Sequence, residues 1–168
     1  MRHDHRTFLE WLRKKMLAKN GKLLHTYKNG VAKIDGFLDD YAFSISMFIK
    51  LYEITFDETY IDDAKKMAEY AIKNFFDEKS GMFYYTSADG ENLIARKMEI
   101  SDNVIPSSNS EMANALFVLG TLTDNATYIE TAKQMLANVY DDMNSYPSSY
   151  SNWGILGMHF TQPFYEVT

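Results

Sequence analysis

Apolar and polar residues along the chain form two kinds of helical segment. Segments 5–19, 58–76 and 126–143 place an apolar residue every three or four positions with charged residues between, as an amphipathic helix does. Segments 39–55, 108–122 and 148–160 are apolar on nearly every side, which is typical of helices that are buried all round. The pattern predicts an all-α chain of six helices.

The order of these segments predicts two layers, because each apolar segment follows an amphipathic one. The apolar helices would form an inner layer and the amphipathic helices an outer layer. The turns at 56–58 and 124–125 are short, whereas the loops 20–38 and 77–107 are long. Consecutive inner helices should then run in the same direction, with both long loops on one rim, where a functional site is expected. We expect residues 1–168 to form a single domain, a two-layer arc of αα-hairpins.

An internal repeat supports the layers. The pattern Thr-x-x-x-Thr-Tyr-Ile-x-x-Ala-Lys-x-Met occurs at 55–67 and again at 123–135, so each matched residue recurs 68 positions later. The motif Pro-Ser-Ser also occurs twice, at 106–108 and 147–149. Because serine is a favoured N-cap residue, we expect Ser108 and Ser148 or Ser149 to begin helices.

The two long loops contain similar turn signals. Segment 21–30 ends in Asn29-Gly30, and segment 81–90 ends in Asp89-Gly90. Both dipeptides favour the type I′ turn of a β-hairpin. The sequence therefore predicts small β-hairpins in the long loops of the rim.

Composition and charge exclude several classes of function. The chain has 168 residues, is 46% hydrophobic and carries a formal net charge of −6 without a basic block, which argues against a nucleic-acid partner. No apolar run is long enough to span a membrane, and the N-terminus lacks the apolar stretch of a signal peptide, so we expect a cytoplasmic protein. The chain has no cysteine, which excludes disulfides, thiolate metal sites and a cysteine nucleophile.

Two motifs in order carry a family resemblance. Residues 36–43 read Gly-Phe-Leu-Asp-Asp-Tyr-Ala-Phe, and Asp102 is followed after three residues by Pro-Ser-Ser-Asn-Ser at 106–110. With Leu-Tyr-Glu-x-Thr at 51–55 between them, the chain resembles the thioredoxin-domain-containing proteins related to spermatogenesis-associated thioredoxin-like protein. The resemblance implies the C-terminal (α/α)6 toroid of that family, similar to N-acylglucosamine 2-epimerases and six-hairpin glycosidases.

The chain departs from the family pattern in three ways. The N-terminal thioredoxin-like domain is missing, and Ser108 stands where the family usually has glycine. A full toroid needs twelve helices, and the pattern here predicts six. We therefore expect half a ring, either a short relative or a piece of a longer protein.

Asp39 and Asp40 are the first candidates for chemistry on the rim. Paired carboxylates beside Tyr41 suit general acid and base catalysis on a sugar, or binding of its hydroxyl groups. The alternative is structural: Asp39 as an N-cap and Asp40 as a first-turn acid that stabilises the helix dipole.

The second long loop supplies Arg96, Asp102 and Asn109. If neighbouring inner helices lie about 8–10 Å apart, Asp102 or Asn109 should lie within about 10 Å of Asp39 or Asp40. The structural alternative here is a capping box, in which Ser108 and Glu111 satisfy the free N–H groups of the helix.

Aromatic residues near the rim offer stacking platforms for sugar rings, although most aromatics at helical spacing are core. Tyr84 and Tyr85 are the best candidates among Tyr27, Tyr84, Tyr85, Tyr146, Tyr150 and Trp153.

The four histidines do not form a zinc pattern, because zinc needs three or four convergent ligands. His3 and His5 lie at the N-terminus, and His25 and His159 are isolated. The sequence contains no phosphate-binding loop, dinucleotide fingerprint or metalloprotease motif, so neither a metal nor a cofactor is indicated.

Two functions remain open at this point. One is a carbohydrate-active or carbohydrate-binding domain, either epimerase/isomerase-like or glycosidase-like, with acid and base groups and no cofactor. The other is a non-catalytic scaffold or interaction module. We also expect a homodimer, because the last inner helix and the tail would leave an apolar flank exposed. That flank comprises Trp153, Ile155, Leu156, Phe160, Phe164 and Tyr165.

Overall fold

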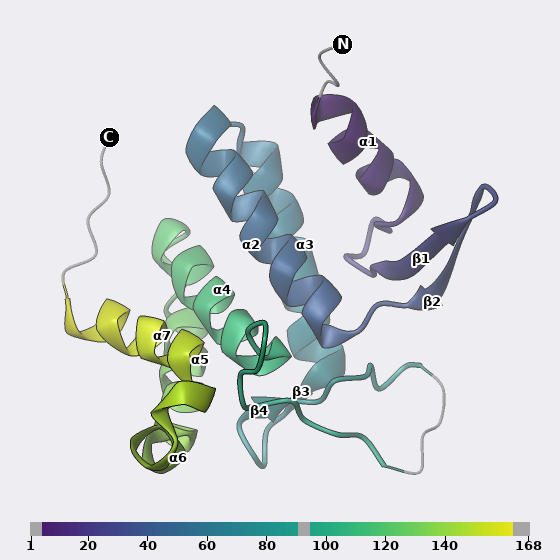
Figure 1. The fold of residues 1–168 in the computed structure, drawn as a ribbon. Coiled ribbons are helices and arrows are strands. Elements are labelled where there is room, and N and C mark those ends of the chain that lie inside the picture. The colour runs from purple at the N-terminus through teal and green to yellow at the C-terminus, as the bar shows by residue number, and fades with distance from the viewer. Residues whose placement is uncertain (1–4, 91–94, 163–168) are drawn as a thin grey trace.

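The computed structural model describes residues 5–90 and 95–162. The described residues form seven α-helices and two small antiparallel sheets (Figure 1). The elements are α1 (His5–Lys15), β1 (Leu24–Lys28), β2 (Val31–Asp35), α2 (Leu38–Thr55), α3 (Glu58–Phe75), β3 (Phe76–Asp77), β4 (Met82–Phe83), α4 (Ser108–Leu122), α5 (Ala126–Asn138), α6 (Tyr140–Ser145), a 3-10 turn (Pro147–Ser149) and α7 (Ser151–Thr161).

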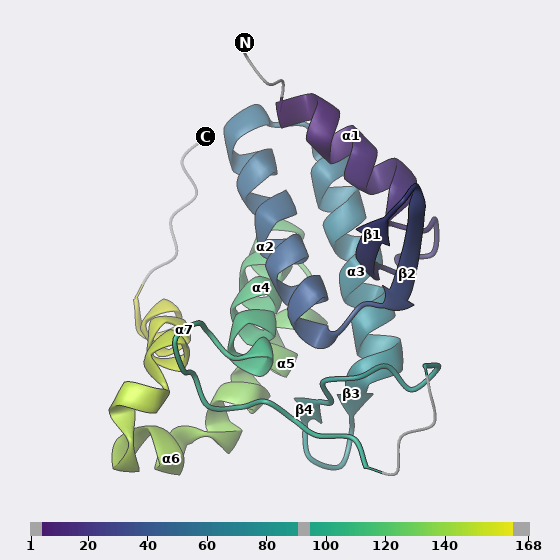
Figure 2. The same ribbon diagram turned by 45° about the vertical axis from the view of Figure 1, so that its right-hand side comes forward.

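The helices form the two layers that the apolar pattern predicts. Helix α2 packs on α4, and α4 packs on α7, so these three helices make a continuous inner row. Helices α3 and α5 lie behind the row, against α2 and α4 respectively (Figures 1 and 2). The all-α arc of αα-hairpins is confirmed. None of the described helices combines the length and the apolar character that crossing a membrane requires.

The internal repeat is also a repeat of local structure. Phe56, the C-cap directly after α2, has the left-handed conformation (φ 55°), and its counterpart after α4, Asp124, has φ 51°. The next residue caps the outer helix in both cases. The Asp57 carboxylate accepts the Thr59 N–H at 3.0 Å, and the Asn125 amide oxygen accepts the Thr127 N–H at 3.1 Å. These caps explain why both inner-to-outer turns are short.

Two predicted helices are shorter than their apolar pattern. Helix α1 ends at Lys15 instead of 19, because the chain reverses through a bridge between Leu17 and Leu23. The segment predicted as 126–143 divides at Val139, whose backbone leaves the helical region (φ −107°, ψ 3°), and continues as the separate α6. Val139 is 2% exposed, so its burial in the core accompanies the bend.

One of the two predicted hairpins is in the expected place. Strands β1 and β2 join at Asn29 and Gly30, which both have positive φ (53° and 82°), as a type I′ turn requires. The prediction of a second hairpin with its turn at Asp89-Gly90 is wrong. Strands β3 and β4 pair earlier instead and turn through Gly81, which has φ 67°.

The capping predictions need correction. The N-cap of α2 is Phe37 and not Asp39, although Asp40 is a first-turn acid as expected. Helix α4 does begin at Ser108, but Ser107 is its cap and accepts the Ser110 N–H at 3.1 Å. The predicted capping box therefore does not form. The last inner helix begins at Ser151, after the 3-10 turn that contains Ser148 and Ser149.

The last inner helix is less exposed than predicted. Trp153 and Leu156 are fully buried, and Phe160 is half-buried. Ile155 and Met158 are 45% and 58% exposed, so an apolar strip remains on α7. Phe164 and Tyr165 lie outside the described residues.

Candidate functional site

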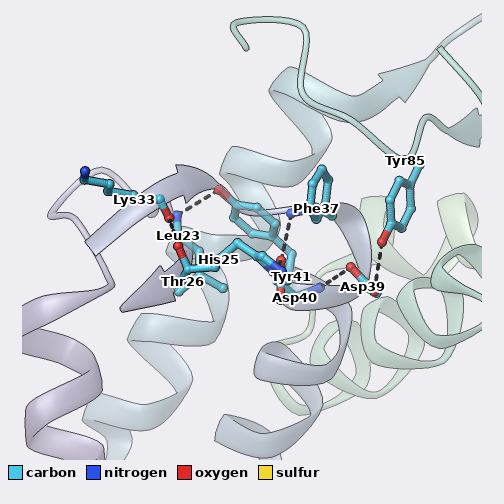
Figure 3. A network of polar contacts seen from close by, with 9 residues as sticks. All are labelled: Leu23, His25, Thr26, Lys33, Phe37, Asp39, Asp40, Tyr41 and Tyr85. Atoms are coloured by element: carbon cyan, nitrogen blue, oxygen red, sulfur yellow. Dashed lines mark hydrogen bonds and ion pairs between the residues drawn. The ribbon is translucent and has the colours of Figure 1, made fainter. Parts of the chain in front are cut away.

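The candidate site lies on the rim where α2 begins. Gly36 carries the chain from β2 into α2, and a Cβ there would lie 2.9 Å from the Leu23 carbonyl oxygen. This close approach brings the β1–β2 hairpin against the first turn of the helix. Asp40 reaches back and accepts the Phe37 N–H at 2.9 Å, which caps the helix without a cap hydroxyl (Figure 3).

His25 is a site residue that sequence reasoning missed. Its Nδ1 lies 2.8 Å from Oδ2 of Asp40, and the imidazole is 39% exposed. In the sequence His25 is an isolated histidine in a loop. The only sequence signal is the predicted hairpin, whose first strand would contain His25 and whose second strand leads into the segment with Asp40.

Asp39 lies beside this pair and contacts a residue of the second long loop. The Tyr85 hydroxyl donates to Oδ2 of Asp39 at 3.1 Å, and Oδ1 accepts the Asp40 N–H at 2.9 Å (Figure 3). Burial, and after it the negative charge of Asp40, raise the pKa of Asp39. Burial, followed by the charge of Asp39, raises the pKa of Tyr85 as well.

Three aromatic rings form a row over these carboxylates. The His25 ring meets the Phe37 ring edge-on at 5.0 Å, and Phe37 stacks on Tyr85 at 5.1 Å with the rings 6° from parallel. Phe37 and Tyr85 are half-buried, so each keeps an accessible portion. The structure thus brings together the predicted residues Asp39, Asp40 and Tyr85.

Tyr41, a predicted binding residue, lies beneath the site. It is 1% exposed, and its hydroxyl accepts the Leu23 N–H at 2.8 Å (Figure 3). Its ring stacks on Tyr70 at 5.5 Å. Tyr41 therefore holds the hairpin against α2 and has no surface to offer a ligand.

Asp102 and Asn109 belong to a second, closed network at the start of α4. Asp102 is 8% exposed, and its Oδ1 accepts the Ser110 hydroxyl at 2.6 Å and the Ser107 N–H at 2.9 Å. Its Oδ2 accepts the Asn152 N–H at 2.8 Å, which ties the rim loop to α7. These bonds give the Asp102 carboxylate a structural role.

The Asn109 side chain is fully buried and hydrogen bonded at both ends. Its amide oxygen accepts the Phe83 N–H at 2.8 Å, and its amide nitrogen donates to the carbonyl oxygens of Phe83 and Glu99, both at 2.9 Å. Asn109 therefore joins β4 to α4. The predicted approach of Asp102 or Asn109 to within about 10 Å of Asp39 or Asp40 stays a prediction.

Arg96 and Tyr84 pack against each other. The Arg96 guanidinium lies 4.2 Å from the centre of the Tyr84 ring and donates to the carbonyl oxygens of Thr86 and Asn74. Burial lowers the pKa of Arg96. These contacts brace the second long loop, and Tyr85 is the residue of the Tyr84-Tyr85 pair that reaches the carboxylates.

The other rim aromatics do not join this row. Tyr27 packs edge-on against Trp11 at 4.8 Å, while Tyr150 and Trp153 are buried and Tyr146 is 68% exposed. Among the described residues, no three histidine, aspartate or glutamate side chains converge in a way that would hold a metal ion.

Curated relatives confirm the resemblance noted in the sequence. Over 113 residues the chain is 28% identical to spermatogenesis-associated protein 20 of Rattus norvegicus and 27% identical to that of Mus musculus. The aligned segment is 67% of this chain but only 14% of each relative, so the chain spans about one seventh of their length. No family model matches the chain.

Solved structures show the same fold. The chain is similar to a D-mannose isomerase with TM-score 0.60 and 19% identity, over 82% of this chain and 34% of that one. A GH76 α-mannanase of Bacteroides thetaiotaomicron aligns with TM-score 0.55 and 19% identity, over 72% and 31% of the two chains. A substituted form of UGL, with dGlcA-Glc-Rha-Glc, aligns with TM-score 0.60 and 15% identity, over 79% and 38%. The arc is therefore part of an α/α-toroid fold.

Proposed function

We propose that this chain binds a carbohydrate at the rim where α2 begins, with Asp39 as an acid and the Asp40–His25 pair as a base. The observation that carries the proposal is the pairing of unlike groups in one place. Asp39 is a carboxyl whose pKa is raised, and it adjoins a second carboxylate held by an imidazole. General acid–base catalysis requires a proton donor and a proton acceptor that reach the same substrate.

The aromatic row supports a sugar as the ligand. The apolar face of a sugar ring packs on an aromatic ring, and Phe37 and Tyr85 lie directly beside Asp39. Oδ1 of Asp40 has no hydrogen bond to any described residue and so remains an acceptor for a hydroxyl group. The names of the structural neighbours include a mannose isomerase and a mannanase, which makes D-mannose the first ligand to test.

The reaction class that fits these groups is cofactor-independent proton transfer, epimerase/isomerase-like or glycosidase-like. In an epimerase- or isomerase-like reaction the Asp40–His25 pair takes a proton from a C–H group of the sugar, and Asp39 gives a proton back to a sugar carbon or oxygen. In a glycosidase-like reaction Asp39 gives its proton to the glycosidic oxygen as the C–O bond breaks, and the pair takes a proton from the attacking water. In both, the Tyr85 hydroxyl positions Asp39. We propose no metal or cofactor in this step.

The proposal is tested by titrating the protein with D-mannose in a calorimeter and by measuring its melting temperature with and without the sugar. We expect saturable binding that stabilises the folded chain. Asp39→Asn and Tyr85→Ala should each weaken binding by about tenfold or more, which corresponds to about 1.4 kcal/mol. Asp124→Asn, which removes a carboxylate at the opposite end of α4, is the matched control and should bind as the unaltered chain does.

A non-catalytic scaffold is the second candidate, and one observation favours it. The carboxylates of Asp39 and Asp40 both accept N–H groups at the start of their own helix. Under this alternative Asp39 and Asp40 act only as caps of their own helix, and no sugar binds. D-mannose that leaves the melting temperature unchanged at millimolar concentration would decide for the scaffold if a broader panel of monosaccharides behaves in the same way.

A further inference from the structure

The inner row of helices carries a second polar site, away from the rim of α2. Helices α2, α4 and α7 share a depression of about 200 Å³ (Figure 1 shows the three helices). Its polar lining comes from all three helices, and the rest of the lining is aliphatic. The polar residues are Ser46, Lys50, Glu111, Asn114, Asn152 and His159.

Glu111 contributes a carboxylate that only neutral groups contact. The Ser46 hydroxyl donates to its Oε1 at 2.5 Å, and the Asn152 amide donates to its Oε2 at 3.4 Å. Within residues 5–90 and 95–162, no lysine, arginine or histidine nitrogen lies within 4.0 Å of this carboxylate. A half-buried carboxylate without a cation is a favourable partner for a positively charged ligand.

The amide nitrogens of the depression donate hydrogen bonds within the protein, whereas its amide oxygens accept none from the described residues. Asn114 donates to the carbonyl oxygens of Ser110 and Asn152, at 2.9 and 3.0 Å. Asn152 donates to the Ser110 hydroxyl and to Glu111. Neither amide oxygen has a hydrogen bond to a described residue. The site therefore presents acceptors, two amide oxygens and a carboxylate, and needs a ligand rich in donors.

The two basic side chains of the lining, Lys50 and His159, have other contacts. The Lys50 ammonium pairs with Glu53 at 2.8 Å, and the Lys50 side chain is 70% exposed. The His159 ring stacks on Phe117 at 5.4 Å. Neither side chain forms an ion pair with Glu111, so the attraction for an external cation remains.

We propose that this depression binds a small primary amine. An alkylammonium group supplies three N–H donors and no acceptor, which matches the carboxylate of Glu111 and the amide oxygens of Asn114 and Asn152. The aliphatic remainder of the lining accommodates the carbon chain. The volume lies below the roughly 300–1,000 Å³ of pockets for drug-sized ligands, which restricts the ligand to a few carbon atoms. The proposal does not depend on the carbohydrate site.

Three probes of matched size test the chemistry on the unaltered protein. n-Butylammonium carries the charge and the donors, tetramethylammonium carries the charge without donors, and n-butanol carries neither the charge nor three donors. Calorimetry at constant ionic strength should show saturable 1:1 binding of n-butylammonium, at least tenfold tighter than binding of the other two. Equal binding of n-butylammonium and tetramethylammonium, or no binding of n-butylammonium, would overturn the proposal without reference to any variant.

Variants locate the site. Glu111→Gln should weaken n-butylammonium binding at least tenfold, whereas Glu111→Asp should keep the preference for n-butylammonium over tetramethylammonium. Glu130→Gln, on the outer helix α5, is the control for the loss of one negative charge. Asp39→Asn should leave amine binding unchanged, which separates this result from the test of the rim site.

A Lys50→Gln variant tests whether the Lys50 ammonium competes with an added amine for the depression. Removal of the Lys50 ammonium should leave amine binding unchanged or strengthen it a few-fold. If the amine binds only after this substitution, Lys50 itself occupies the site and the proposal is wrong. Unchanged amine binding by a folded Glu111→Gln variant would contradict the proposal equally.

Discussion

The starts of the two inner helices α2 and α4 occupy equivalent places in the repeat and use their polar groups differently. At the start of α4 the Asp102 carboxylate accepts three hydrogen bonds and is nearly inaccessible. At the start of α2 the Asp39 and Asp40 carboxylates are half-buried and lie beside His25 and Tyr85. A carboxylate with a full set of internal donors stabilises the fold, whereas one that is desolvated and incompletely paired is available for chemistry.

The cause of this difference is local. The N-cap of α4 is Ser107, whose hydroxyl accepts a helix N–H, so the Asp102 carboxylate can accept hydrogen bonds from the loop and from α7. The N-cap of α2 is Phe37, whose side chain cannot accept a hydrogen bond, and the acids of the first turn, Asp39 and Asp40, accept free N–H groups. The aromatic ring at the cap position then becomes part of the wall beside Asp39. The two helix starts thus differ in their cap residue, a serine before α4 and a phenylalanine before α2.

The strongest test of the comparison is the loss of each carboxylate. Asp102→Ala should lower the free energy of unfolding by about 3 kcal/mol, because it leaves buried N–H groups without an acceptor. Asp40→Ala should cost about 1 kcal/mol, since the Asp40 carboxylate is partly exposed to solvent. Urea denaturation of both variants measures the difference. Equal losses in the two variants would show that the two helix starts are not energetically different.

Alanine substitutions of the two serines at the start of α4 should change the stability of the chain in different directions. Ser107→Ala should destabilise the chain by about 1 kcal/mol, because the Ser110 N–H loses its acceptor. Ser108→Ala should be neutral or stabilise by up to about 1 kcal/mol, since the Ser108 hydroxyl is buried without a hydrogen-bond partner. Melting temperatures of the two variants decide the matter. A larger loss of stability for Ser108→Ala than for Ser107→Ala would show that Ser108, and not Ser107, is the N-cap.

The open helix start should also show itself in its pH dependence. The pKa of Asp39 is raised in the folded chain, so the native state holds this proton more tightly than the unfolded state. The contribution of Asp39 to stability is therefore complete below its unfolded pKa, near 3.8, and is lost as the pH rises through the folded pKa. Asp39→Asn should gain stability relative to the unaltered chain over that rise.

Carboxyl resonances in an NMR titration measure this pKa directly. Asp40→Asn should lower the pKa of Asp39, because it removes the neighbouring negative charge. Tyr85→Phe should raise that pKa further, because it removes a hydrogen bond to the charged form. A pKa of Asp39 that does not respond to either substitution would remove the electrostatic basis of the proposed acid.

The third inner helix extends the comparison, with the smallest expected effect. Ile155 and Met158 remain exposed on α7, which packs on α4 as its neighbour in the inner row. We predict that this strip supports a homodimer, so light scattering should give twice the mass of 19.5 kDa at micromolar concentration. Met158→Glu should restore the monomer and leave the melting temperature of the monomer nearly unchanged. A monomer at every concentration would contradict this prediction.

Periodicity alone predicted the layers, because a helix that is apolar on all sides has to be covered on all sides. It placed Phe48, Leu116 and Trp153 in the core, and the 68-residue repeat predicted matching turns at Phe56 and Asp124. The type I′ turn at Asn29-Gly30 was likewise predictable, since few residue pairs accept two positive φ angles. Helix ends were predicted less well, because at Val139 and at Lys15 packing and a bridge overrode the apolar pattern.

The candidate site, like the fold, was predicted only in part from the sequence. The sequence identified Asp39, Asp40, Asp102 and Asn109 as polar candidates on the rim. Asp39, Asp40 and Asn109 lie in the first turns of α2 and α4, whereas Asp102 lies in the loop before α4. Only the tertiary structure decided which of them are internally satisfied, because the partners of Asp102 and Asn109 come from residues as distant as Asn152 and Phe83. It also brought His25 to Asp40 and Tyr85 to Asp39 across 15 and 46 positions of the chain. Desolvation and hydrogen bonding depend on such distant neighbours, which a local pattern does not contain.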